Sequence, residues 1–274
     1  MQNMTVVRAL TSLWSQRPSL PAHSLIDRSR VDRRRHHGVP VTWIDGARAA
    51  QATIVHLHGG AYLHGERPTH WEWLEEITRR AGTAGAMVHY RMPPRFPFPV
   101  AYDDALEAVR ELVDTAVVRS GRWVLSGDSA GAGLALAVAQ ALRDQSIPLP
   151  ALLLLTSPWA DLTGVRDGDA ELRRAARLYT GPIPAEDPRI SPVHGDLQGL
   201  PPVHLVAGGG DAMRSDGLRL RQRLEEAGTE LDYLEAPGQV HNYPITGSGA
   251  DPQAARRSQI AAVRRALGMD PAEL

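Results

Sequence analysis

The stretch that decides the fold runs from residue 123 to residue 139 and reads Trp123-Val124-Leu125-Ser126-Gly127-Asp128-Ser129-Ala130-Gly131-Ala132-Gly133-Leu134-Ala135-Leu136-Ala137-Val138-Ala139. An apolar run typical of a short strand leads into Gly-x-Ser-x-Gly, and good helix formers follow it. We therefore expect a strand, a sharp turn and a helix, with Ser129 in a strained backbone conformation at the turn. Glycine on both sides lets strand and helix pack closely, so the serine hydroxyl is expected above the carboxyl end of a sheet.

Strand and helix patterns alternate along the rest of the chain. Strands are predicted at residues 53–57, with a buried-strand pattern, and at 87–90, 151–156, 203–207 and 231–235. Helices are predicted at 100–115, with an amphipathic pattern, and at 215–227 and 252–267. This alternation predicts an α/β fold with a mostly parallel central sheet and helices on both faces. The chain of 274 residues is long enough for one such domain, spanning residues 1–274.

Two segments stand outside the alternation. Residues 5–15 have helical spacing of apolar side chains, and residues 163–192 are polar with a weakly helical piece at 170–178. We expect a small helical cap over Ser129, formed by about residues 1–22 and 163–192. Residues 24–45 give only weak strand signals, at 25–31 and 39–43. The basic run at 33–37 suggests a solvated hairpin turn in preference to a binding patch.

The composition excludes several kinds of chemistry. The chain has no cysteine and no lysine, since all thirty basic residues are arginine, so cysteine nucleophiles, thiolate zinc sites, Schiff bases and Ser-Lys dyads are ruled out. A net charge of −1 gives no reason to expect nucleic acid or an anionic membrane as a partner. No apolar run approaches the length of a membrane span, and the first twenty residues lack the apolar core of a signal peptide, so a cytoplasmic location is expected.

A serine nucleophile needs a base within hydrogen-bond reach and a group that orients this base. His241 follows the last predicted strand and Asp211 follows the strand before it, so both are expected at the same sheet edge as Ser129. The chain order Ser129, Asp211, His241 is that of the α/β-hydrolase triad. Asp216, Asp161 and Asp232 are rivals for the acidic position. Only Asp211 stands at the end of the strand next to the one that leads to His241, and Asp216 is expected to orient the neighbouring loop.

The oxyanion formed by attack on a carbonyl needs preorganised donors. The amide of Ala130 is one candidate, and the turn Gly59-Gly60-Ala61 after the strand at 53–57 is expected to supply the others. His56, His58 and His64 near this turn suggest a metal site as an alternative. No acidic ligand follows them at a useful spacing, so neither a metal nor another cofactor is expected.

With these motifs in order, residues 50–268 resemble the hormone-sensitive lipase family of α/β-hydrolases. The resemblance rests on the motifs His58-Gly59-Gly60-Ala61-Tyr62, Tyr90-Arg91 with Phe98-Pro99, Gly127-Asp128-Ser129-Ala130-Gly131, Ser157-Pro158-Trp159-Ala160-Asp161-Leu162, Gly210-Asp211 with Asp216, and residues 238–241. It implies an α/β-hydrolase fold, the same three catalytic residues, an oxyanion hole at Gly59, Gly60 and Ala130, and esters of short or medium acyl chains as substrates. Ala61 stands where the family usually has a third glycine, which is associated there with bulky alcohol groups, and the loop at 92–96 also departs from the family pattern.

These observations predict a carboxylic-ester hydrolase that acts through an acyl-enzyme on Ser129. A lactone hydrolase or an acyltransferase on the same scaffold is the first alternative, since a cap that excludes water favours transfer over hydrolysis. A ligand-binding homologue without catalysis is the second. The expected partner is a small-molecule ester or lactone, and the oligomeric state is open, with a homodimer among the choices.

Overall fold

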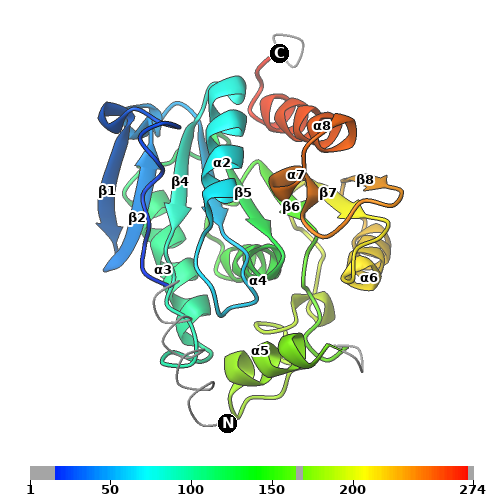
Figure 1. Cartoon of the computed structure of the whole chain (residues 1–274). Helices are drawn as coiled ribbons and strands as arrows, with labels where there is room; N and C mark the ends of the chain where they lie inside the picture. The colour runs from blue at the N-terminus through cyan, green and yellow to red at the C-terminus, as the bar shows by residue number, and fades with distance from the viewer. Residues whose placement is uncertain (1–15, 165–168, 271–274) are drawn as a thin grey trace.

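The computed structural model describes residues 16–164 and 169–270 and has an eight-stranded sheet at its centre (Figure 1). The order of the strands is β1-β2-β4-β3-β5-β6-β7-β8. The first two strands run antiparallel to their neighbours, and the pairs from β4 to β8 are parallel. The strands are β1 (Val31–His36), β2 (Val39–Ile44), β3 (Thr53–Leu57), β4 (Ala84–Val88), β5 (Trp123–Asp128), β6 (Leu152–Thr156), β7 (Val203–Gly208) and β8 (Leu231–Ala236).

Helices cover both faces of this sheet. One face carries α3, α4 and α6, and the other carries α2, α7 and α8 (Figure 1). The helices are α2 (Pro68–Ala81), α3 (Val100–Asp114), α4 (Ala130–Asp144), α5 (Ala170–Thr180), α6 (Arg214–Glu226), α7 (Tyr243–Thr246) and α8 (Ala250–Ala266), with short 3₁₀ turns at Arg28–Arg30, Gly46–Arg48 and Pro192–His194. The prediction of an α/β fold with a mostly parallel sheet is confirmed.

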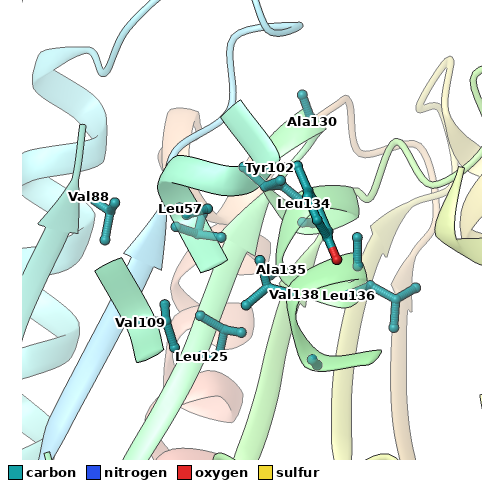
Figure 2. Close-up of a cluster of buried hydrophobic side chains, with 14 of the residues drawn as sticks. Leu57, Val88, Tyr102, Val109, Leu125, Ala130, Leu134, Ala135, Leu136 and Val138 are labelled. Carbon is teal, nitrogen blue, oxygen red and sulfur yellow. The ribbon is translucent and has the colours of Figure 1, made fainter. Parts of the chain in front are cut away.

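The core between the sheet and the helices α3 and α4 is built from aliphatic side chains of both layers. Figure 2 shows Leu57, Val88 and Leu125 from the strands facing Val109 of α3 and Leu134 of α4. All five are almost completely buried. Burial of this apolar surface holds α4, and therefore Ser129 at its start, against the sheet.

Some predictions from the sequence were misplaced. The second buried strand is Ala84–Val88 and not 87–90, because Gly85 and Ala86 present little side chain and weaken the apolar signal. A Cβ at Gly85 would lie 2.8 Å from Thr78 of α2, so this strand packs directly against the helix. Helix α2 itself was not predicted. The strand signal at 25–31 belongs to a strand that starts at residue 31, whereas the hairpin turn expected near 33–37 is present at His37 and Gly38.

The expected cap is described only in part. Residues 1–15, with the helix predicted at 5–15, and residues 165–168 lie outside the described residues. Helix α5 lies beyond the carboxyl ends of the parallel strands (Figure 1). Its Tyr179 ring stacks on Tyr62 next to the turn after β3, with ring centroids 3.7 Å apart. The carbonyl of Tyr179 accepts a hydrogen bond from the amide of Phe98 at 2.7 Å, so α5 is fixed to the edge of the sheet where Ser129 lies.

Candidate active site

Ser129 sits at a sharp turn between β5 and α4. Its backbone angles are φ 52° and ψ −122°, a conformation that residues with a side chain rarely adopt. A Cβ at Gly127 would lie 2.3 Å from the carbonyl oxygen of Gly131, and one at Gly131 would lie 2.0 Å from that of Leu57. Only glycine therefore fits on either side, and the strand and helix close around a serine whose hydroxyl points away from both.

His241 and Asp211 meet Ser129 in a line of hydrogen bonds. Nε2 of His241 lies 2.9 Å from Oγ of Ser129, and Nδ1 lies 2.8 Å and 2.9 Å from the two carboxylate oxygens of Asp211. The carboxylate can only accept, so Nδ1 carries the proton and Nε2 faces the hydroxyl with a free lone pair. This is the arrangement that a general base needs, and the structure brings the three predicted residues together.

The surroundings of Asp211 keep it ionised. Burial raises the pKa of this carboxyl, but the hydrogen bond and charge of His241, the Ser157 hydroxyl and the amide of Met213 act in the other direction and lower the pKa overall. The carboxylate is 1% exposed, whereas the His241 side chain is 35% exposed. Asp211 is therefore shielded from solvent, whereas His241 is accessible to solvent and substrate.

The rival carboxylates have other tasks. Asp216 lies in α6 and its Oδ2 accepts a hydrogen bond from the amide of Asp161 at 3.2 Å. It therefore orients the loop after β6, and not the loop of Asp211 as expected. Burial raises the pKa of Asp216 to about 7. Asp161 binds Thr163, His194 and Arg219, and Asp232 binds His204. None of these contacts involves His241.

The turn after β3 corrects one prediction. The amide of Gly59 donates to Oδ1 of Asp128 at 2.8 Å, so it is not available to an oxyanion. A Cβ at Gly59 would lie 2.2 Å from Oδ2 of Asp128, and this contact explains why glycine is needed there. The next two residues turn back with positive φ, 124° at Gly60 and 53° at Ala61. Within the described ranges no hydrogen bond occupies the amides of Gly60, Ala61 or Ala130, and they remain the candidate donors.

The histidines next to this turn belong to hydrogen-bond networks. His58 contacts the carbonyl of Gly59 through Nδ1 at 2.8 Å and stacks on Tyr90, and His56 binds the Ser126 hydroxyl at 3.1 Å. Burial lowers the pKa of His58 to about 4, which keeps its ring neutral. In the part of the chain that the structure describes, no cluster of three or more His, Cys, Asp or Glu side chains is placed to hold a metal ion.

Two residues of the site had not been predicted, His70 and Asn242. His70 lies in the unpredicted helix α2 and its Nε2 is 3.3 Å from Oδ2 of Asp128. Asn242 follows His241 directly and its side-chain nitrogen donates to the same oxygen at 2.6 Å. The only signal in the sequence was the position of Asn242 next to the predicted base.

A pocket of about 490 Å³ opens over Ser129 and His241. Leu63, Leu172 and Met213 give it apolar walls, and Arg67 and Glu171 stand at its polar side. A smaller chamber of about 70 Å³ shares the wall formed by Asp169, Leu172, Ala212 and Met213 and continues to Trp159 and Asp216. The site therefore offers one roomy compartment at the serine and one narrow compartment behind the shared wall.

Over residues 16–164 and 169–270 the structure contains no helix with the length and apolar character required to cross a membrane.

Comparison with known proteins places these features in a family. Residues 54–245 match the family model described as alpha/beta hydrolase fold. An acetyl-hydrolase of Streptomyces hygroscopicus is 39% identical over 73% of this chain and 70% of its own length, and an esterase of Acinetobacter venetianus is 29% identical over 88% and 80%. Among solved structures, a hormone-sensitive lipase from a metagenome library is 30% identical and covers 96% of this chain and 92% of its own, with a TM-score of 0.78.

Proposed function

Because this chain belongs to the α/β-hydrolase family, in the branch of the hormone-sensitive-lipase-like bacterial carboxylesterases, we propose that Ser129, His241 and Asp211 are its catalytic triad. The chain is a carboxylic-ester hydrolase, as the relatives named acetyl-hydrolase, esterase and ethyl acetate hydrolase show. The observation that carries the assignment of residues is the unbroken line of hydrogen bonds from Asp211 through His241 to Ser129.

The proposed reaction has two stages. His241 Nε2 takes the proton of the Ser129 hydroxyl while Oγ forms a bond to the ester carbonyl carbon. The tetrahedral intermediate collapses, the bond to the alcohol oxygen breaks, and His241 returns the proton to this oxygen. Water then repeats the sequence on the acyl-enzyme and releases the acid. Asp211 stays ionised throughout and stabilises the imidazolium.

We assign the oxyanion to the amides of Gly60, Ala61 and Ala130. Gly60 and Ala61 line the pocket together with Ser129, and Ala130 follows Ser129 as the first residue of α4, whereas the Gly59 amide is held by Asp128. Each such donor typically stabilises the transition state by about 3 kcal/mol. Positive φ at Gly60 and Ala61 turns the peptide units of this segment away from the strand direction, which supports the assignment.

The narrow chamber supports a preference for short acyl groups. Its volume of about 70 Å³ accommodates only a few carbon atoms, and it shares a wall with the pocket over Ser129. The exposure of His241 favours hydrolysis over acyl transfer, because water reaches the base directly.

Hydrolysis of p-nitrophenyl esters from acetate to dodecanoate tests this proposal. We expect kcat/KM to be highest between acetate and butyrate and to fall for longer chains. A maximum at octanoate or beyond would contradict the assignment of the acyl group to the narrow chamber. The cytoplasmic location, the homodimer and the contribution of residues 1–22 to a cap stay predictions, and size-exclusion chromatography tests the second of them.

A further inference from the structure

The carboxylate of Asp128 is a meeting point of three separate segments. Oδ1 accepts the amide of Gly59 at 2.8 Å, and Oδ2 accepts the side-chain nitrogen of Asn242 at 2.6 Å. Nε2 of His70 lies 3.3 Å from Oδ2, and Nε2 of His56 lies 3.3 Å from Oδ1. The side chain is fully buried. One group, adjacent to Ser129 in sequence, thus binds the oxyanion turn, the start of α2 and the loop of the catalytic histidine.

Three of these partners, the Gly59 amide, the side-chain nitrogen of Asn242 and Nε2 of His70, present hydrogen-bond donors to the carboxylate. The amide of Arg67 donates to Nδ1 of His70 at 2.8 Å, so the proton of this ring lies on Nε2 and points to Asp128. Burial raises the pKa of Asp128, but His70 and His56 outweigh burial and hold the pKa well below its usual range. The group is therefore a carboxylate whose position is set by charge-assisted hydrogen bonds.

Asn242 is held at two points. Its backbone has φ 55° and ψ 28°, a left-handed conformation that asparagine tolerates better than most residues. Its amide donates to the Ser157 hydroxyl at 3.0 Å, and its side chain donates to Asp128. Since His241 immediately precedes it, these two bonds fix the backbone from which the catalytic imidazole projects.

We propose that Asn242 and Asp128 form a positioning pair that holds His241 and the oxyanion turn in register with Ser129. The inference rests on the proposed function of the triad. Neither residue takes part in bond making. The pair acts because Asp128 is next to the nucleophile, Asn242 is next to the base, and the Gly59 amide joins the oxyanion turn to both. A displacement of about 1 Å in such a constellation costs about 100-fold in rate.

The test combines three variants with a swap of the pair. Asn242→Ala removes the hydrogen bond between residues 242 and 128. Asn242→Asp brings two carboxylates together at this contact, and Asp128→Asn brings two side-chain amides together there. The double variant Asp128→Asn/Asn242→Asp restores a direct donor–acceptor bond with the direction reversed. The Gly59 amide keeps an acceptor, whereas Nε2 of His70 loses its acceptor, as it does in Asp128→Asn. We expect Asn242→Ala to lower kcat by about 10- to 100-fold with KM changed less than about threefold. We expect the double variant to recover at least about tenfold over Asp128→Asn, because both variants lack the acceptor for His70 and differ only at residue 242.

Gln140→Ala is the matched control. Gln140 is as buried as Asn242, and its side chain donates to the carbonyl of Pro192 at 2.8 Å, away from the pocket. If burial of an amide alone matters, both alanine variants lose thermal stability and both keep kcat. Loss of kcat only in Asn242→Ala, with thermal midpoints of the two variants similar, supports the positioning pair.

A second readout needs no ester turnover. The rate at which a fluorophosphonate labels the serine reports the alignment of Ser129 and His241, and we expect it to fall in parallel with kcat in each variant. Labelling and kcat unchanged in Asn242→Ala, or no recovery in the double variant, would overturn the inference while the triad stands. Absence of labelling at Ser129 in the unmodified protein would overturn the proposed function, and the inference with it.

Discussion

Two buried carboxylates with histidine partners flank Ser129, and they do different things. Asp211 and His241 lie on one side, and Asp128 with His70 lies on the other. Both carboxyl groups have a lowered pKa, and both bind a histidine nitrogen at 2.8–3.3 Å. By residue type the two clusters are alike.

The two clusters differ in the partner of the histidine nitrogen that does not contact the carboxylate. In His241 this nitrogen lies 2.9 Å from the Ser129 hydroxyl and the side chain is 35% exposed. In His70 it accepts the amide of Arg67, and the side chain is 7% exposed. A histidine acts as a base only if one nitrogen is free for the reacting proton. Hydrogen-bond occupancy and access, more than composition, therefore distinguish the proposed catalytic cluster from the proposed positioning cluster.

Removing the imidazole ring of His241 or of His70 is expected to reveal the largest difference between the two clusters. His241→Ala is expected to lower kcat by about 10⁴- to 10⁶-fold, because no other group replaces the base. His70→Ala is expected to lower kcat by about 100-fold or less, through Asp128 alone. Steady-state kinetics with p-nitrophenyl acetate measures both, and His23→Ala, at an exposed position, serves as control. Similar losses in the two variants would mean that His70 is also part of the reaction.

The next largest loss of kcat is expected when Asp211, the proposed catalytic carboxylate, is neutralised. Asp211→Asn is expected to lower kcat by about 10⁴-fold, since the amide favours the wrong tautomer of His241. The thermal midpoint is expected to change by only a few degrees, because the amide retains one oxygen for the amide of Met213. Activity within about tenfold of the unmodified protein would assign the acid to another residue, with Asp216 the first to test.

Asp128 is expected to make the stability of the fold depend on acid. Its pKa is lowered in the folded protein, so the unfolded chain binds more protons below about pH 4, and the free energy of unfolding falls as the pH drops through that window. Asp128→Asn removes this proton uptake. We expect the variant to be less stable at pH 7 and to have a flatter stability profile below pH 4, measured by urea unfolding. A slope as steep as that of the unmodified protein would contradict the account.

The smallest expected effect concerns Asp216. Its raised pKa makes the free energy of unfolding change with pH in the direction opposite to that of Asp128. Its pKa is raised to about 7, so the folded protein binds more protons than the unfolded chain between about pH 4 and pH 7, and this group lowers stability as the pH rises. Asp216→Asn is expected to gain stability relative to the unmodified protein as the pH rises from 5 to 8, by a few kcal/mol at most. Urea unfolding at the two pH values measures this difference. An equal difference at both values would show that Asp216 does not titrate in this range.

The sequence allowed the parallel sheet to be predicted and the three residues of the proposed triad to be chosen, because both depend on local patterns. Gly127 and Gly131 around Ser129 mark a turn that only glycine can make, and the carboxyl ends of parallel strands bring Asp211 and His241 to one edge. The partners of Asp128 depend on tertiary contacts between α2, β3 and the histidine loop, which no periodicity shows. His70 was missed because α2 starts with Pro68-Thr69-His70 and carries two tryptophans among charged residues.

The role of Gly59 illustrates the same limit. Its place in the turn after β3 predicts a donor to the oxyanion. The structure shows that Asp128, 69 residues away, takes this amide. Only the packing of β5 beside β3 makes that bond, so residue type and spacing were insufficient to predict it.

Mass mapping after reaction with a fluorophosphonate tests the proposal that Ser129 is the nucleophile of this esterase. We predict one adduct, on the peptide that contains Ser129, together with loss of p-nitrophenyl acetate turnover. In Ser129→Ala we predict no adduct, turnover lower by about 10⁴-fold or more, and a thermal midpoint close to that of the unmodified protein. An adduct on another serine, or turnover retained in Ser129→Ala, would contradict the account.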